Sequence, residues 1–179
     1  GGIIGCLAWE PGNAWFLTPV SVWIFFKLVH NATSATNAAG RGLIFGWFLF
    51  YGSLFWLNSL HKFHSLAPLG VVLLALYGGI YPSLTGFLAH KFSNSNSRVS
   101  NWIIFISIWL LTEWVRTLGR LAFPLVQLGH SWTHRPDLIQ HASLLGELGI
   151  TLQVLLVAWL FECCVSFLRG AVSYTHLTL

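Results

Sequence analysis

The chain alternates long apolar segments with short polar connectors. Gly42–Leu60 and Ser65–Ala89 contain no Asp, Glu, Lys or Arg. Because a helix needs about 20 apolar residues to cross the hydrocarbon core, both are predicted to be transmembrane helices. Further apolar segments lie at Trp15–Val29, Asn101–Thr112 and Leu148–Leu168. The Asn101–Thr112 segment reaches spanning length if its helix continues through Arg120.

Together with a truncated helix at Gly1–Cys6, these segments predict an all-α, polytopic membrane helical bundle with about five complete transmembrane helices. Residues 1–170 form one membrane domain in this interpretation. The chain contains no methionine, so it is expected to begin after the true start. Residues 171–179 are expected to be a non-native tail, because SYTHLTL is Thr-rich, uncharged and without an apolar face. Period-2 alternation, typical of a membrane barrel, does not occur.

Composition supports a bilayer environment. Hydrophobic residues make up 55% of the chain and charged residues 8%, with a mean hydropathy of +0.70. A soluble domain carries roughly 25% charged residues, so this chain could not cover its surface in water. The net charge of +4 comes from basic residues scattered between apolar runs, which is typical of membrane-helix flanks. No nucleic-acid partner is therefore predicted, and we expect a monomer without a cofactor.

The preference for basic residues on the cytoplasmic side orients the bundle by a margin of one residue. With the first helix running outward, the cytoplasmic group is Lys27, Arg41, Lys91, Arg98 and Arg169. The outer group is Lys62, Arg116, Arg120 and Arg135. Three acidic residues accompany the outer group, namely Glu113, Asp137 and Glu147. Mixed charge of this kind suits a functional cluster better than a topological signal.

The densest polar cluster lies in TEWVRTLGRLAFPLVQLGHSW, directly after an apolar run. If the helix continues to Arg120, then Trp109, Glu113, Arg116 and Arg120 share a face about 60° wide. A charge at the bilayer centre costs roughly 2.5–3.5 kcal/mol or more, so this face should point into the bundle or an aqueous cavity. Two interpretations stay open: an ion pair that fixes the helix end, or the polar wall of a substrate cavity.

The second arginine favours the cavity. One glutamate cannot neutralise both Arg116 and Arg120, so one guanidinium is expected to be free to meet an anion such as a lipid phosphate. Beyond the arginines, Pro124 should end regular helix and Gly129 should permit a sharp turn. Non-helical backbone at membrane depth must be buried in protein or line a cavity. Residues 121–142 are therefore predicted to form a re-entrant or surface loop.

These motifs resemble one known family. TEWVRT, FPLVQLGHS and LIQHASLLGELGITLQVLLVAW are similar to segments of bacterial apolipoprotein N-acyltransferases. LAWEPGNAWFLTPVSV, GRGLIFGWFLFYGSLFWLNSL and LLALYGGIYPSLTGFLA resemble upstream parts of that family. The resemblance covers about residues 3–170. It departs at Thr117, Leu125 and His130, where the family pattern has glycine, tryptophan and tyrosine.

The resemblance implies an enzyme of the bacterial inner membrane. Such enzymes move an acyl chain from a phospholipid to the N-terminal diacylglyceryl-cysteine amine of a lipoprotein. A glutamate, a lysine and a nucleophilic cysteine carry the chemistry in a nitrilase-like domain, expected to lie outside this chain. Cys163 and Cys164 are not expected to be that nucleophile, because they sit in an apolar helix without the electropositive setting a thiolate needs. The chain alone is expected to be inactive.

The chain is then expected to contribute lipid substrate admission and scaffolding, with no catalytic residue of its own. The candidate substrate-binding residues are Trp56, Glu113, Arg116, Arg120, Phe123, Pro124, Gln127 and Gly129.

Two other classes stay open. A transporter or channel would use helices broken at Pro19, Pro82 or Gly78–Gly79, although no internal repeat accompanies them. A histidine-based membrane metalloenzyme would use His130, His134, Asp137 and His141, with His61 and His64. Pro136 interrupts any helix that would align His134 with His141, so no metal site is predicted.

Overall fold

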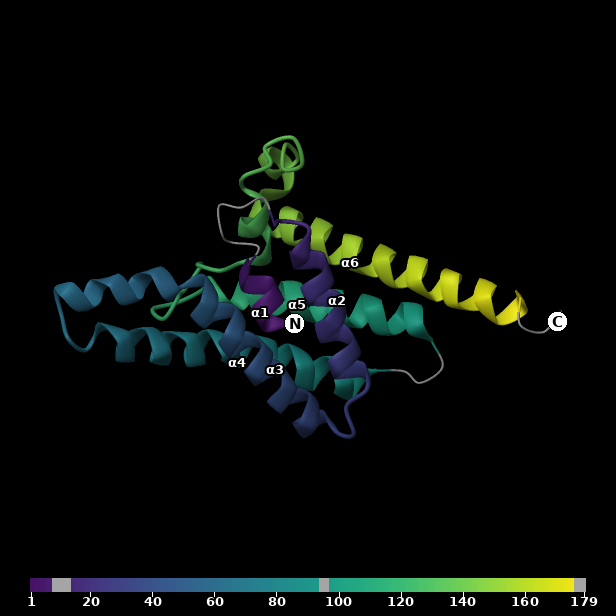
Figure 1. Ribbon diagram of the computed structural model, residues 1–179, viewed down its shortest axis with the longest axis horizontal. Coiled ribbons are helices and arrows are strands. Elements are labelled where there is room, and N and C mark those ends of the chain that lie inside the picture. Colours follow the sequence, from purple (N-terminus) through teal and green to yellow (C-terminus); the bar gives the residue numbers. More distant parts are fainter. Residues whose placement is uncertain (8–13, 94–96, 176–179) are drawn as a thin grey trace.

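The computed structural model describes residues 1–7, 14–93 and 97–175. Residues 8–13 and 94–96, and the last four residues of the expected tail, lie outside these ranges. Within them every regular element is helical, as predicted (Figure 1). The elements are α1 (Gly2–Cys6), α2 (Leu17–His30), α3 (Ala35–Ser53), η2 (Phe55–Lys62), α4 (Ala67–Phe92), α5 (Arg98–Arg116), η3 (Leu128–Trp132) and α6 (Ala142–Thr175).

Two of the described helices are long and apolar enough to cross a membrane, α4 and the Ala142–Leu168 part of α6. The pair α3 and η2, bent by 52°, would be a third if it forms one span. The expected number of about five complete spans is therefore not confirmed. Helix α2 is apolar but has only 14 residues, and α5 includes three charged residues, Arg98, Glu113 and Arg116.

Helices α3 and α4 approach each other closely along their glycines. A Cβ atom added at Gly46 would lie 2.8 Å from the Cα of Gly79, and one at Gly42 would overlap the carbonyl oxygen of Pro82. Close approach at the Gly42/Gly46 spacing is what small residues on membrane helices permit. Helix α4 runs unbroken through Gly78, Gly79 and Pro82. The break that a transporter would need there is absent, because these residues serve packing against α3.

The connector between α2 and α3 is short, because α2 ends at His30 and α3 already begins at Ala35. The hydroxyl of Ser34 accepts a hydrogen bond from the backbone N–H of Asn37 at 3.1 Å. A serine cap of this kind satisfies a backbone donor that the first turn leaves without a partner. The polar residues after Asn31 therefore start a helix instead of extending a loop.

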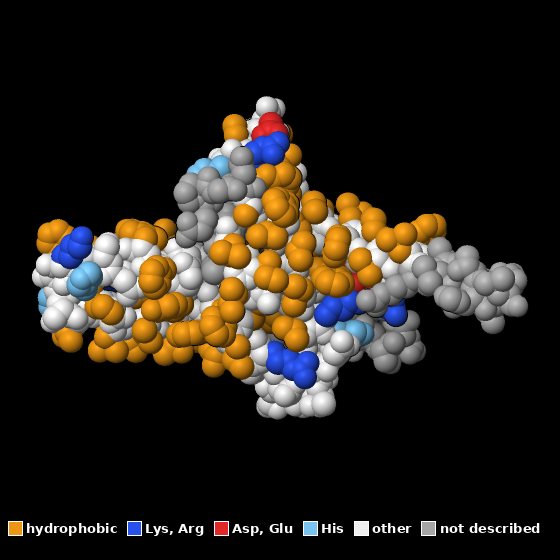
Figure 2. Space-filling model, in the orientation of Figure 1, with side chains coloured by type: hydrophobic (Ala, Val, Ile, Leu, Met, Phe, Trp, Pro, Cys, Tyr) orange, Lys and Arg blue, Asp and Glu red, His pale blue; other side chains and the backbone are white. Residues whose placement is uncertain are grey.

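The core is an aromatic cluster between α2, α3 and α5. Phe25 stacks on Phe45 with ring centroids 4.4 Å apart, and Phe26 stacks on Trp102 at 3.9 Å. Phe105 lies against Phe25, Phe26 and Trp102. Many leucines on the outer faces of α4, α5 and α6 stay exposed, and Figure 2 shows hydrophobic side chains over most of this face. An exterior this apolar suits contact with lipid tails.

The predicted continuation of α5 to Arg120 is wrong. The helix ends at Arg116, and Gly119 turns the chain with a left-handed φ of +79°. The carbonyl of Arg116 accepts a hydrogen bond from the N–H of Phe123 at 2.9 Å, so the chain folds back directly after the helix. The segment from 121 to 142 first packs against the bundle through η3, and its later part forms the projection at the top of Figure 1.

Candidate functional site

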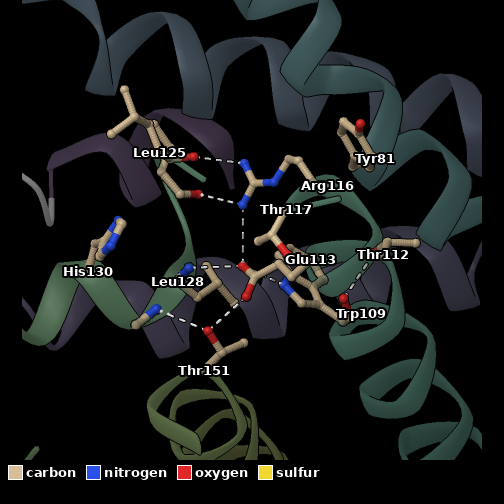
Figure 3. A network of polar contacts seen from close by, with 12 residues as sticks. Tyr81, Trp109, Thr112, Glu113, Arg116, Thr117, Leu125, Leu128, His130 and Thr151 are labelled. Atoms are coloured by element: carbon tan, nitrogen blue, oxygen red, sulfur yellow. Dashed lines mark hydrogen bonds and ion pairs between the residues drawn. The ribbon is translucent and has the colours of Figure 1, made fainter. Parts of the chain in front are cut away.

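Glu113 is the centre of a buried polar network in which three elements meet (Figure 3). Its side chain accepts hydrogen bonds from the indole N–H of Trp109 at 3.2 Å, the backbone N–H of Leu128 at 2.9 Å and the hydroxyl of Thr151 at 2.8 Å. These donors belong to α5, η3 and α6. Glu113 is only 5% exposed. The carboxylate therefore fastens the loop after α5 to two helices.

Arg116 fastens the same loop from the other side. Its Nη1 donates to the carbonyl oxygen of Leu125 at 2.9 Å, and its Nη2 donates to that of Val126 at 3.3 Å. The guanidinium lies 3.9 Å from Glu113 Oε1 and the residue is 2% exposed. Its charge lies in the protein interior, and its two Nη atoms bind the chain's own backbone, while its buried Nε has no hydrogen-bond partner among the described residues.

Two aromatic rings complete the surroundings of this guanidinium. Its Cζ lies 5.0 Å from the ring centroid of Phe50 on α3 and 5.8 Å from that of Tyr81 on α4. Such cation–π contacts strengthen when water is excluded, as it is here. Arg116 thus links α3, α4, α5 and the following loop.

Arg120 does not join this network. It is exposed beyond the end of α5, and the structure gives it no ion pair or hydrogen bond among the described residues. The expected common helix face of Glu113, Arg116 and Arg120 is therefore not formed. The guanidinium of Arg120 is exposed, whereas that of Arg116 is buried.

The loop owes its shape to residues other than those predicted. Val126 adopts a left-handed φ of +59°, a strained conformation for a β-branched residue, whereas Gly129 does not have a positive φ. Gly129 instead permits close packing: its N–H donates to the hydroxyl of Thr151 at 3.2 Å, and a Cβ there would lie 3.1 Å from the carbonyl oxygen of Glu147. The turn expected at Gly129 lies at Val126.

Gln127, His130 and Glu147 form a smaller polar group beside this network. Gln127 is 2% exposed, and with its amide nitrogen turned toward Glu147 it donates to both carboxylate oxygens. His130 Nε2 pairs with the same carboxylate. The first part of the loop is therefore tied to the start of α6 as well as to α5.

A cavity of about 250 Å³ opens next to the loop. It lies between the end of α3, η2 and the loop, and its lining residues are Ser53, Leu54, Trp56, Leu125, Val126, His130, Thr133 and His134. Trp56 is 65% exposed and Leu125 is 46% exposed. Apolar side chains and hydroxyl and imidazole groups both line the cavity, so it is suited to an amphipathic ligand.

The remaining candidates lie around the cavity without lining it. Phe123 is half-buried, with its ring centroid 6.4 Å from that of Phe50, and Pro124 is exposed. The structure thus brings Trp56 close to the loop but separates Arg120 from Glu113 and Arg116.

The histidines and cysteines occupy separate places. Among the described residues, no three of His, Cys, Asp and Glu lie close enough to hold a metal ion. His130 is instead engaged by Glu147. Cys163 and Cys164 are free thiols exposed on α6.

The sequence model of the apolipoprotein N-acyltransferase N-terminal domain matches residues 1–160. The chain belongs to the apolipoprotein N-acyltransferase family. The apolipoprotein N-acyltransferase of Shewanella oneidensis is 31% identical over 172 residues, covering 92% of this chain and 33% of the relative. That of Haemophilus influenzae is 34% identical over 157 residues, covering 84% of this chain and 28% of the relative. The chain therefore spans about a third of the length of these relatives.

Membership of this family fits the apolar helices and agrees with the resemblance seen in the sequence. What sequence reasoning missed is Thr151, which receives the Gly129 N–H and donates to Glu113. It lies within an uncharged, apolar stretch of α6, where a lone threonine gives no signal. A search for hydroxyl residues on apolar helices predicted to pack against a buried carboxylate could have found it.

Proposed function

We propose that this chain is the membrane domain of a lipoprotein N-acyltransferase in the bacterial inner membrane. The whole protein would transfer an acyl chain from a phospholipid to the N-terminal diacylglyceryl-cysteine amine of an apolipoprotein. Family membership over residues 1–160 supports this activity, and the apolar helices support the membrane location. Bond making would require parts of the protein beyond this chain, and the domain would act as a monomer.

The domain's own role is lipid admission and scaffolding. The observation that carries this role is the cavity between η2 and the loop, where Trp56 and Leu125 are exposed and apolar while Thr133 and His134 are polar. An acyl chain would lie against the first pair, and the glycerol and headgroup atoms would meet the second. Arg120, exposed on the same loop, is available to a lipid phosphate.

Glu113 and Arg116 serve this role indirectly. Their polar atoms bind the loop's backbone, so they hold the cavity wall in place and do not contact the substrate. In this proposal they are positioning residues.

The test uses the full-length gene product in detergent or nanodiscs, with a phospholipid donor and a lipopeptide acceptor. Trp56→Ala and Leu125→Ser should raise KM for the phospholipid several-fold with a smaller change in kcat, because they remove apolar contact and not chemistry. Phe63→Ala is the matched control, since Phe63 is 87% exposed just beyond η2 and does not line the cavity. Both cavity variants should keep the wild-type Tm.

An unchanged KM in both cavity variants would contradict lipid admission through this cavity. A second assay tests whether this chain alone can catalyse acyl transfer. The chain of 179 residues alone should show no acyl transfer, and transfer by it would overturn the claim that bond making lies elsewhere.

A further inference from the structure

A second polar cavity lies at the opposite end of α5 from Glu113. It has a volume of about 170 Å³ and forms where the end of α2, the start of α5 and the second half of α6 meet. Its charged or titratable lining residues are Lys27, His30, Arg98 and Glu162. Phe26 and Trp102 close its apolar side. Neither the proposed lipid admission nor the loop network uses this cavity.

The charges in this cavity do not cancel. Lys27 Nζ lies 2.5 Å from Glu162 Oε1, and the indole N–H of Trp23 donates to Glu162 Oε2 at 2.6 Å. Both carboxylate oxygens are thus engaged, and Glu162 compensates the charge of Lys27. Among the described residues, Arg98 donates a hydrogen bond to the hydroxyl of Ser166, at 3.5 Å, and it is exposed. The guanidinium of Arg98 therefore adds a positive charge that this one carboxylate does not balance.

Apolar surface continues outward from the cavity. Val99 and Ile103, on the first turns of α5, are 52% and 54% exposed. Leu160 on α6 is 60% exposed. Figure 2 shows basic side chains bordered by hydrophobic ones near the crossing of α2 and α5. A ligand that fits this surface combines an anionic group with a hydrocarbon chain.

We propose that this cavity binds the phosphate of an anionic glycerophospholipid, with Arg98 and Lys27 as its donors. The acyl chains lie along the exposed apolar side of α5, at Val99 and Ile103. Guanidinium groups pair well with phosphate oxygens, and a headgroup without its own ammonium avoids repulsion from the two basic side chains. The site lies at the other end of the bundle from the substrate cavity, so the lipid bound here stabilises the fold and is not consumed.

The experiment measures thermal unfolding and native mass spectra of the full-length protein in micelles doped with lipid. Phosphatidylglycerol should raise Tm above the value in phosphatidylcholine and give a bound-lipid adduct. Arg98→Gln should weaken this binding by about five-fold, the effect expected for one basic residue at a membrane surface. Because Arg98 is exposed, the variant should fold normally.

Lys91→Gln is the matched control. Lys91 is exposed in the last turn of α4, lies against the ring of Phe87 and does not line this cavity. It should keep the wild-type response to phosphatidylglycerol. Equal losses in Lys91→Gln and Arg98→Gln would overturn the proposal, since general attraction between charges would then explain the binding.

A last arm separates a lipid headgroup from a free anion. Inorganic phosphate at the same concentration should leave Tm unchanged, because it lacks the acyl chains that contact α5. A shift equal to that of phosphatidylglycerol would overturn the lipid assignment in favour of a free-phosphate site. Loss of acyl transfer has no bearing on either readout, so this proposal fails or stands separately from the proposed function.

Discussion

Glu113 and Glu162 are both buried carboxylates on apolar helices, and each accepts a hydrogen bond from an indole N–H, yet they do different things. Glu113 is surrounded by donors of its own chain, from α5, η3 and α6. Glu162 pairs with Lys27, whose side chain is 31% exposed, at the edge of an open cavity. The first network, the closed one, leaves beside it a cavity of only about 20 Å³, whereas the second borders a cavity of about 170 Å³ that a ligand can enter.

The difference teaches how to interpret charge in a membrane helix. Intramembrane ionisable residues are functional candidates by default, and Glu113 with Arg116 met that description from the sequence. The structure shows that both residues use their polar atoms to hold a loop. A charge indicates a ligand site only where its partners leave it accessible.

The largest loss of stability should come from removing the carboxylate of Glu113 from its network. Glu113→Ala leaves the guanidinium of Arg116 buried without its carboxylate and removes the acceptor for the Leu128 N–H, so we expect a loss of roughly 3–5 kcal/mol in the free energy of unfolding. Thermal unfolding of the full-length protein measures it. Glu113→Gln keeps an acceptor and should lose clearly less. Wild-type stability in Glu113→Ala would contradict the claim that this network stabilises the fold.

A smaller loss should follow from removing one bridge in the same network. Thr151→Val keeps the side-chain shape but deprives Glu113 of a donor and the Gly129 N–H of its acceptor, for an expected cost of about 1–3 kcal/mol. Amide hydrogen exchange should accelerate at Leu128 and Gly129. Thr133→Val, at an exposed position, serves as the control and should leave exchange there unchanged.

Breaking the Lys27–Glu162 pair, the open one, should lower the free energy of unfolding by less than Glu113→Ala does. Lys27→Met removes the cationic partner of Glu162. Because solvent reaches this pair and the Trp23 indole still donates to the carboxylate, we expect a loss of roughly 1–2 kcal/mol in the free energy of unfolding. The loss should shrink as salt is added, because exposed charges are screened. A loss as large as that of Glu113→Ala would erase the contrast between closed and open networks.

The smallest change in stability should come from breaking an ion pair that lies outside the membrane helices. Arg135 donates to both oxygens of Asp137, at 3.0 and 2.6 Å, and this contact lowers the pKa of Asp137 below its ordinary value. A lowered pKa gives stability that is present above the unfolded-state pKa and is lost as pH falls through the folded one. Both groups are exposed, so Asp137→Asn should leave Tm almost unchanged at neutral pH, and a large drop would contradict this.

Hydrophobic runs predicted the helical class and approximate places of α2, α4 and α6, because apolar length is a property of the sequence itself. The end of α5 was mispredicted because the helical face was extended through Gly119, the residue at which the chain turns. What ends the helix is the left-handed turn at Gly119 together with tertiary contacts to the loop.

The sequence predicted the burial of two site residues but not the partners that they bind. Composition and helical spacing indicated that Glu113 and Arg116 point inward, which the structure confirms. Their partners could not be predicted, because backbone atoms of Leu125, Val126 and Leu128 carry no signature in a sequence. The roles of these charges therefore depended on contacts that only the folded chain displays.

The glycine contact between α3 and α4 also restricts how a lipid tail can travel. Where Gly42 and Gly46 meet Pro82 and Gly79, the two backbones touch and leave no gap of hydrocarbon width. A tail moving in from the bilayer cannot slip between these helices along that stretch. If lipid enters as proposed, its route passes the far end of α3 instead, where the chain bends by 52° into η2 and Trp56 is exposed.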